Sequence, residues 1–429
     1  MEEVRKLQKK NNVVDIAQII CFCLITFNME WALWSFVPMN SAIFAMSCVG
    51  VFALNFFVIV KNYKSNILKM VIFEYVFFVI WSVIMIVIYG YFYHIYQNVT
   101  FLIFTMDGHA IFFIRLFVSV IPCMFFVDFC DFKETKLFKI LFGLIIASNT
   151  FFTIRAVRIY PDALRARETM EVWGEEELLF GTPDYAMVYG MALIFPVLLQ
   201  KCKNAPARSM TKWFYIICTV MVAYMIVVSQ FATALLLTIV STILFMLLNM
   251  KPNTRIIVLV AVAVIIFSIR VPKLDVMLLN ALSETVSGTW AGKLHDLAET
   301  FSGGVATGSV LGRTDLYTKS LQAFIESPVF GKLLKSTTDI GGHATAIDVL
   351  GLAGIIGFIP FILTVCFNYK RLKSTCNYKK NKAAIIACIT EFILLVFLKN
   401  IITSLSVFFA FFVMVPFLLK IDDEEFVIR

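Results

Sequence analysis

Residues 231–249, FATALLLTIVSTILFMLLN, decide the fold class of this chain. They include no charged side chain, and as a helix they would be about 28 Å long, which matches the hydrocarbon core of a bilayer. Apolar stretches of similar length recur from one end of the 429 residues to the other. We therefore expect a polytopic membrane protein.

The composition agrees with this expectation. Hydrophobic residues make up 60% of the chain and charged residues 15%, and there are 44 Phe. Soluble domains contain roughly 45–50% apolar and 25% charged residues, so this chain has too much apolar surface to bury inside itself. The net charge of +8 indicates cytoplasmic loops in such a protein and not the binding of nucleic acid.

The expected fold is an all-α bundle of about twelve transmembrane spans, forming a single integral membrane domain over residues 1–429. No small-residue cleavage site follows the first apolar run, so we expect that run to remain as an anchor. The expected spans are 13–36, 41–60, 67–89, 111–127, 137–154, 185–199, 213–229, 231–249, 254–269, 344–367, 383–399 and 401–419.

Lys and Arg set the expected orientation, because cytoplasmic loops of membrane proteins carry an excess of them. With the amino terminus inside, most of the 37 basic residues fall in cytoplasmic segments, and the short outer connections at 37–40 and 90–110 contain none. We expect both termini in the cytoplasm. Residues 155–184 and 270–343 then form two large extracytoplasmic loops.

The second large loop contains a predicted amphipathic helix at 314–327, TDLYTKSLQAFIES. Its apolar residues at helical spacing are Tyr317, Leu321, Phe324 and Ile325. We expect this helix to lie at the outer membrane surface, against the bundle.

Several kinds of chemistry lack a sequence signature. There is no GxxxxGK[ST] nucleotide-binding motif, no HExxH, and no CxxC pair with the spacing of a zinc site. The four His are scattered along the chain. We expect no metal site and no cofactor.

Three segments carry a resemblance to a known superfamily. GGHATAIDVLGLAGIIGF (341–358) places the nine residues 345–353 between His343-Ala344 and a GxxG. GRTDLYTKSLQAFIESPVFGK (312–332) combines Gly-Arg, an amphipathic helix and Pro-hydrophobic-hydrophobic-Gly, and FGTPDYAMVYGMALIFPVLL (180–199) opens with Thr-Pro and ends near a Leu. In order and outer position they resemble the motifs of the O-antigen polymerase and O-antigen ligase superfamily.

The resemblance also has departures. Ala344 stands where a polar residue usually follows the His, so one hydrogen bond at the site is missing. Ser229-Gln230-Phe231 stands where many ligases have Ser followed by Arg or Lys, so another cation must do that work here. Asp184 replaces an Asn.

The resemblance implies a GT-C-type glycosyltransferase in the cell membrane of a bacterium, acting on its outer face. Such an enzyme polymerises polyprenyl-diphosphate-linked oligosaccharide repeats into capsule, exopolysaccharide or O-antigen. The expected partners are that lipid-linked donor and acceptor, membrane lipid, a flippase and a chain-length regulator. The reaction needs a cation for the diphosphate, which suits the planar fork of Arg, and a base of near-neutral pKa, which suits His.

Arg313 and His343 are the expected catalytic residues. Arg313 follows Gly312 at the expected start of the 314–327 helix, where free N–H groups and the helix dipole favour an anion. His343 stands where the outer loop becomes a transmembrane helix, and Gly341 and Gly342 before it would let the backbone approach the substrate.

Other residues are expected to bind substrate. Arg165, Arg167 and Arg158 lie in the first large loop and would supply the second cation for the diphosphate or contact an acidic glycan. Arg115, near the outer end of its span, and Asp348, just after His343, would line the same cavity, because charges inside spans usually have a function.

Other functions remain open at this point. A ligase would use the same motifs and a different acceptor. A lipid-oligosaccharide flippase or other secondary transporter of twelve helices would place ionisable residues in matching positions of two repeats, and no such symmetry is visible. A metal-dependent lipid-phosphate-sugar transferase would need acidic residues in the first outer loop, where only Glu30 lies nearby.

Overall fold

The computed structural model describes most of the chain. The described residues are 12–61, 66–88, 98–101, 104–129, 135–160, 163–164, 181–270, 274–285, 289–302, 308–334, 340–402 and 404–421. Arg165 and Arg167 therefore lie outside the described residues.

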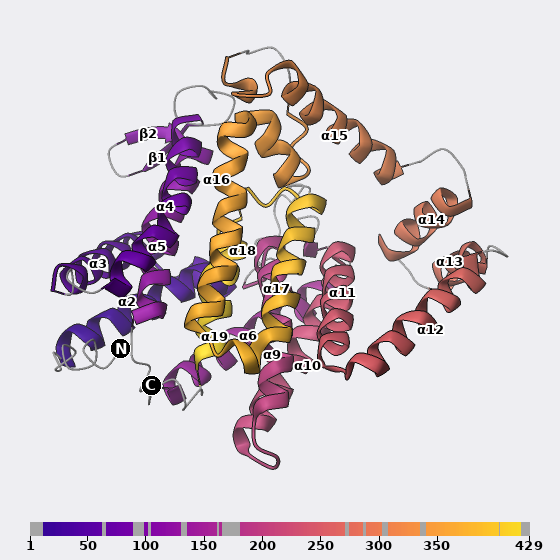
Figure 1. The fold of residues 1–429 in the computed structure, drawn as a ribbon, viewed down its shortest axis with the longest axis horizontal. Helices are drawn as coiled ribbons and strands as arrows, with labels where there is room; N and C mark the ends of the chain where they lie inside the picture. The colour runs from indigo at the N-terminus through magenta and orange to yellow at the C-terminus, as the bar shows by residue number, and fades with distance from the viewer. Residues whose placement is uncertain are drawn as a thin grey trace.

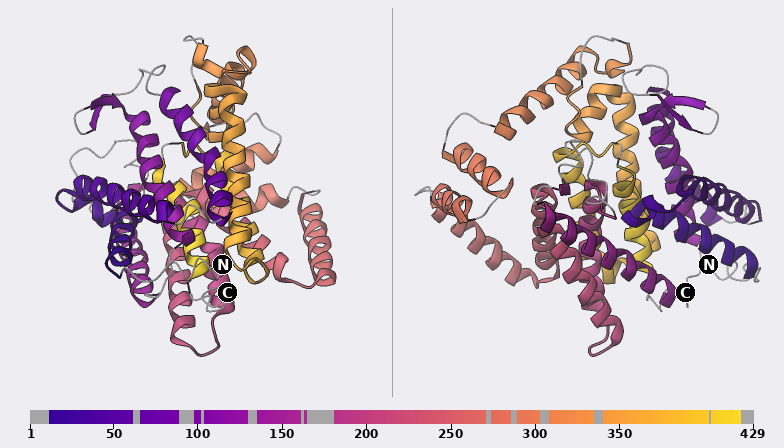
Figure 2. Two further views of the ribbon diagram at one scale, coloured as in Figure 1. Left: turned by 60° about the vertical axis from the view of Figure 1, so that its left-hand side comes forward. Right: turned by 180° about the vertical axis from the view of Figure 1, so that it is seen from behind.

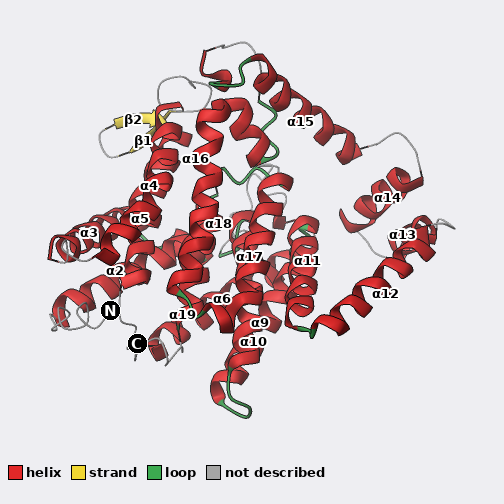
Figure 3. Cartoon of the chain, in the orientation of Figure 1, coloured by secondary structure: helices red, strands yellow, loops and turns green. Residues whose placement is uncertain are grey.

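The fold is helical apart from one hairpin (Figures 1 and 3). The bundle helices are α2 (Asn12–Glu30), α3 (Asn40–Lys61), α4 (Asn66–Val87), α5 (Gly108–Phe129), α6 (Thr135–Ile159), α9 (Tyr185–Asn204), α10 (Met210–Val228), α11 (Ala232–Asn249), α16 (Thr345–Thr375), α17 (Tyr378–Leu398), α18 (Leu405–Phe409), the π-helical turn η4 (Ala410–Met414) and α19 (Val415–Lys420). The remaining helices are η1 (Ala32–Phe36), α12 (Pro252–Arg270), α13 (Leu274–Thr285), α14 (Thr289–Ser302), α15 (Gly308–Glu326) and η3 (Gly331–Leu334).

A two-stranded hairpin lies in the connection at 90–110, and the described fold is otherwise helical, as expected. Strands β1 (Asn98–Phe101) and β2 (Phe104–Asp107) pair antiparallel, with Val99 opposite Met106. β-branched and aromatic residues fill both strands, and these favour extended structure where they have cross-strand partners.

Among the described residues, seven helices are long and apolar enough to cross a membrane, which makes this a helical membrane protein. They are Ile111–Asp128, Lys136–Ile159, Tyr185–Asn204, Met210–Val228, Ala232–Asn249, Thr345–Thr375 and Tyr378–Leu398. Shorter apolar helices are Ile16–Glu30, Asn40–Asn55, Tyr75–Val87 and Leu405–Lys420. Helical structure covers every predicted span, but the count of twelve remains a prediction.

The outward faces of these helices are apolar. On α10, Ile217 is 55% exposed, Val220 61% and Tyr224 49%, all on one side of the helix. α11 has a similar exposed row, formed by Leu236, Ile239, Ile243 and Met246. Soluble proteins rarely expose apolar surface of this extent, and lipid is the solvent that such faces require.

α9 lies at the centre of the bundle. In its apolar window 78% of the residues are buried, against 28% for both α10 and α11. It packs against α10, α11, α17 and α18. Gly190 lies close to η4 and α2, because a Cβ there would be 3.3 Å from both Ala410 and the carboxyl group of Glu30.

The predicted span 401–419 is not one regular helix. α18 is followed by the π-turn η4 and then by α19, which has Pro416 near its start. The segment is held by aromatic packing, with the rings of Phe392 and Phe411 stacked at 3.9 Å. Its residues are almost fully buried, so its irregular backbone is shielded from lipid.

Helices α12 to α15 form an arm beside the bundle. α12 leaves the lower end of α11 in Figure 1 and leads to α13 and α14, which pack on each other; α15 returns the chain to α16 (Figures 1 and 2). The predicted loop 270–343 is thus largely helical in its described part.

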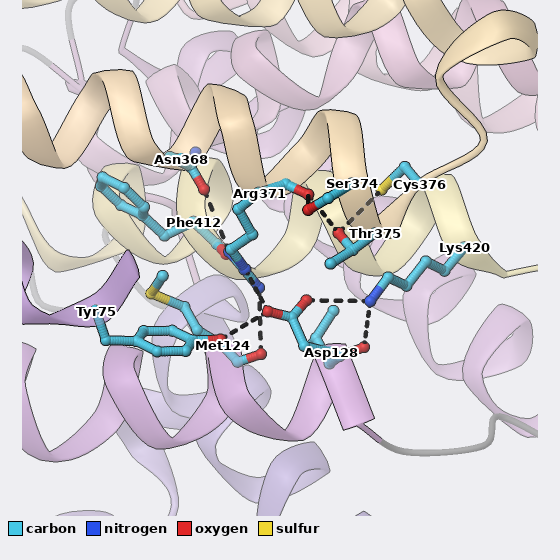
Figure 4. A network of polar contacts seen from close by, with 11 residues as sticks. Tyr75, Met124, Asp128, Asn368, Arg371, Ser374, Thr375, Cys376, Phe412 and Lys420 are labelled. Atoms are coloured by element: carbon cyan, nitrogen blue, oxygen red, sulfur yellow. Dashed lines mark hydrogen bonds and ion pairs between the residues drawn. The ribbon is translucent and has the colours of Figure 1, made fainter. Parts of the chain in front are cut away.

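A buried ionic network joins four segments at the lower end of the bundle in Figure 1 (Figure 4). Arg371 of α16 and Asp128 of α5 are each 1% exposed, and Arg371 Nε donates to Asp128 Oδ2 at 2.6 Å. Tyr75 of α4 donates to the same oxygen at 2.6 Å. Lys420 of α19 donates to Asp128 Oδ1 at 3.1 Å. Both carboxylate oxygens therefore have charged donors, as a buried charge requires.

The network also repairs the backbone at Pro416. Proline has no N–H, so Phe412, four residues earlier, lacks the helical donor for its carbonyl oxygen. Arg371 Nη1 donates to that oxygen at 2.8 Å. Arg371 Nη2 donates to the carbonyl oxygen of Met124 on α5, at 3.2 Å. The guanidinium of Arg371 on α16 thus forms hydrogen bonds with both α5 and the η4 turn.

Candidate active site

His343 lies immediately before α16, as the sequence predicts. The helix begins at Thr345, and Ala344 is its N-cap with an extended backbone. His343 is half-buried, and the centroid of its ring lies 6.0 Å from that of Tyr317 on α15. Thr345 Oγ1 and N–H both bind the carbonyl oxygen of Lys399, at the end of α17. The imidazole is therefore at the level where α17 ends.

Asp348 fixes the backbone on both sides of His343. Its side chain is 2% exposed. Oδ2 accepts from the N–H of Ala344 at 2.9 Å, and Oδ1 accepts from the N–H of Gly342 at 3.2 Å. Ser320 of α15 donates to Oδ1 at 2.7 Å and accepts from the N–H of Gly341 at 2.9 Å. Asp348 therefore positions the histidine loop, and its carboxylate is occupied by protein donors where the sequence predicted contact with substrate.

Gly341 has a different role from the predicted one. A Cβ at this position would lie 1.9 Å from the carbonyl oxygen of Leu316, so the loop crosses the backbone of α15 at a distance that only glycine allows. The glycine brings the loop close to α15, whereas the sequence analysis expected it to bring the loop close to substrate. Gly342, with φ of 66°, turns the chain toward His343.

The GxxG sequence breaks α16. Gly354 has φ 58° and ψ −155°, so residues 345–353 form a short first segment and residues 355–375 a long second one (Figure 1). Gly357 lets the two segments meet, since a Cβ there would lie 2.2 Å from the Cβ of Ala353. The predicted span 344–367 thus lies within the candidate span Thr345–Thr375, and its helix is kinked at Gly354.

The Pro-Val-Phe-Gly turn at 328–331 fills this break. The N–H groups of Ile355 and Ile356 donate to the carbonyl oxygens of Pro328 and Val329, at 2.9 and 3.3 Å. A Cβ on Gly354 would lie 2.4 Å from the oxygen of Val329. The turn satisfies N–H groups that the break removes from the helix, so α15 and α16 are joined by backbone hydrogen bonds.

Replacing Gly341 with Ala should destabilise the protein. The new methyl group would overlap a backbone oxygen that cannot rotate away, and overpacking costs about 1–3 kcal/mol or more. Thermal unfolding of the detergent-purified protein measures the loss. Gly292→Ala in α14 is the matched control, because nothing lies within 4 Å of its Cβ position. Equal melting temperatures for the two variants would contradict this account of Gly341.

Arg313 does not lie at a helix start. α15 begins at Gly308, so position 313 is in the second turn of the helix, where the backbone N–H groups are already used. The predicted support from a helix N-terminus is therefore wrong. Position 313 is one turn before Tyr317, the residue beside His343, and so belongs to the same side of α15.

The face of α15 that packs on the bundle also differs from the prediction. Ser320 and Ala323 are buried against α16, whereas Leu321 is 41% and Ile325 73% exposed. The physical reason is close approach: a Cβ on Gly351 of α16 would lie 2.7 Å from the carbonyl oxygen of Ser320. The close contact between α15 and α16 therefore requires small residues such as Ser320 and Ala323, and the apolar side chains of Leu321 and Ile325 point away from α16.

The remaining predicted arginines are not joined to His343 by any interaction in the described part of the chain. Arg158 is exposed in the last turn of α6, which continues to Ile159 into the predicted outer loop. Arg115 of α5 faces the Cys48 thiol of α3.

A different cation lies at the position where a ligase-like Arg or Lys was missing. Lys293 of α14 donates to the carbonyl oxygen of Gln230 at 3.2 Å, at the turn between α10 and α11. Gln230 has φ of 59°. The arm thus delivers an amine to the Ser229-Gln230-Phe231 turn from 63 residues away.

No group of three or more His, Cys, Asp or Glu among the described residues could hold a metal ion. The site offers the imidazole of His343, which is held on a loop between α15 and α16 beside the phenol ring of Tyr317. No protein-family model matches this sequence, and no curated protein matches it.

Proposed function

We propose that this protein is a membrane glycosyltransferase that polymerises polyprenyl-diphosphate-linked oligosaccharide repeats into a surface polysaccharide. It acts without a metal on the outer face of a bacterial cell membrane, with both termini in the cytoplasm and a GT-C-type bundle. A ligase that uses the same site with another acceptor is the nearest alternative.

One observation carries the proposal: two of the three segments that resemble the polymerase and ligase motifs, 312–332 and 341–358, contact each other around His343. Segment 312–332 supplies Tyr317 beside the imidazole and Ser320 beneath the loop. Its Pro-Val-Phe-Gly end docks in the break made by the GxxG. Because the two segments hold each other in place around His343, we take them to serve one site. A histidine at a helix boundary without a function would not need these contacts.

The proposed reaction requires one proton transfer and one charge to be neutralised. An acceptor hydroxyl oxygen bonds to the anomeric carbon of the donor while the bond from that carbon to the diphosphate oxygen breaks. His343 takes the hydroxyl proton. Arg313 neutralises the departing diphosphate through the bidentate geometry of its guanidinium. The donor supplies its own activation, so no nucleotide is consumed.

Purified protein in proteoliposomes tests the proposal directly. Incubation with a lipid-diphosphate oligosaccharide should give a ladder of longer lipid-linked products on sizing gels. EDTA should leave the ladder unchanged, because no step uses a metal. Loss of the ladder with EDTA would favour a metal-dependent transferase, and transfer of single repeats to another lipid acceptor would favour the ligase.

A specific observation favours a second candidate, a proton-coupled transporter. Glu30 of α2 and Glu391 of α17 are each 1% exposed, and neither forms an ion pair with a described residue. Ionisable residues in such positions are used as proton carriers by transporters. In a deletion host, this candidate predicts that lipid-linked repeats accumulate on the cytoplasmic face, whereas the polymerase predicts that single repeats accumulate outside.

A further inference from the structure

Arg115 is a membrane-embedded cation without a partner among the described residues. It lies in α5, inside the candidate span Ile111–Asp128. Within the described part of the chain its guanidinium makes no hydrogen bond and no ion pair, and its Nε is buried without an acceptor. Arg371, which lies in the candidate span of α16, has four oxygen acceptors from the protein, one of them the side-chain amide oxygen of Asn368. The contrast shows how fully this bundle can satisfy a guanidinium where the partner is the protein.

No described side chain supplies an anion to Arg115. The titratable group that interacts with it among the described residues is the Cys48 thiol of α3, which is 2% exposed. The face of α3 turned away from Cys48 is apolar and exposed, with Met46 75% and Val49 69% exposed, as expected of a helix that borders lipid. An unpaired guanidinium in a span is costly, so its partner must come from outside the described protein groups.

The depth of Arg115 indicates the source of that partner. It is four residues inside the span, about 6 Å along the helix, at the end opposite the Asp128 network. An Arg side chain can extend from this depth to the level of lipid head groups while its stem stays in the apolar region. The bidentate fork of Arg matches a phosphate group.

We propose that Arg115 binds the phosphate of a membrane lipid between α3 and α5. The ligand chemistry is a lipid-borne phosphate in the leaflet that lies at the His343 end of the bundle. Either a bilayer phospholipid or a polyprenyl phosphate carries it. The site does not depend on the glycosyl transfer proposed above, because no interaction within the described residues joins Arg115 to His343.

Lipid-dependent stabilisation of the delipidated protein tests this site. Wild-type protein in a neutral detergent should gain thermal stability when phosphatidylglycerol or polyprenyl phosphate is added, and Arg115→Gln should need at least about tenfold more lipid for half of that gain. Arg115→Lys should keep part of the response, since it keeps the charge without the fork. Arg208→Gln is the matched control, because Arg208 is exposed in the α9–α10 turn at the other end of the bundle.

The two lipids identify which molecule carries the phosphate, and two results would overturn the proposal. A response to only one of the two lipids assigns the phosphate to that lipid. An equal response of wild type and Arg115→Gln to both lipids would refute the site. So would protection of wild type by inorganic phosphate alone at the same concentration, since the ligand would then be a free anion. Folding of the variant is verified by its unchanged gel-filtration profile in detergent.

Discussion

Replacement of His343 with Ala is expected to slow chain extension by roughly a hundred- to ten-thousand-fold, the usual contribution of a positioned general base. The reason is that the acceptor hydroxyl would then have to lose its proton to water. Single-turnover extension of a lipid-diphosphate oligosaccharide by purified protein measures this rate.

Arg313→Ala should give a loss of similar size, and Arg313→Lys should recover part of it because a charge without the bidentate fork remains.

Two controls separate catalysis from structure at this site. Tyr317→Phe keeps the ring beside His343 and should extend chains at close to the wild-type rate. The extension rate of the wild type should rise with pH as the base loses its proton, and the profile of His343→Ala should lack that rise. Normal extension by His343→Ala at normal protein level would contradict the assigned role.

The seven long apolar helices of the described chain were predictable, because hydropathy over about twenty residues needs no knowledge of neighbours. The position of His343 at the loop–helix boundary was also predictable, since a polar run ends there and an apolar run begins. The break inside α16 was not. GIIG in an apolar run is typical of an ordinary helix. The broken backbone is stable inside the membrane because carbonyl oxygens of the turn at 328–331 accept hydrogen bonds from its free N–H groups, and this turn is distant in the sequence.

The predicted helix 314–327 exists within α15, but its start and its packing face were predicted wrongly. The start was placed after Gly312, whereas α15 begins at Gly308, so Arg313 was given an anion-binding N-terminus that it does not have. Apolar spacing suggested that Leu321 and Ile325 face the bundle, but close packing against Gly351 requires the small Ser320 and Ala323 instead. Sequence spacing marks an apolar flank without saying whether protein or lipid covers it.

The largest surprise concerns charges that the sequence assigned to cytoplasmic loops. Asp128 and Arg371 are 243 positions apart, and both lie in segments counted toward the positive-inside bias. The structure buries both side chains at the lower helix ends. Nothing local in either segment signals this, because the pairing depends on how α5 and α16 pack.

Asp128→Asn is therefore expected to be strongly destabilising. Removing one partner of a buried ion pair leaves the other charge uncompensated, at a cost of about 3–5 kcal/mol. The amide still reaches Tyr75 and keeps the shape of the site, so the loss reports charge. Unfolding of the detergent-solubilised protein by heat or denaturant measures it. Lys370→Met on the neighbouring exposed position of α16 is the matched control, and it should change stability by less than about 0.5 kcal/mol.

The double variant Asp128→Leu with Arg371→Met separates pairing from packing. Replacing both charges with apolar groups of similar volume is often near neutral, so it should recover most of the stability lost in Asp128→Asn. Recovery should stop short of wild type, because the carbonyl oxygen of Phe412 loses the donor that Pro416 cannot provide. A double variant as unstable as Asp128→Asn would contradict this expectation: the lost donors to the carbonyl oxygens of Phe412 and Met124, together with the lost anionic partner of Lys420, would then cost as much as the uncompensated charge of Arg371.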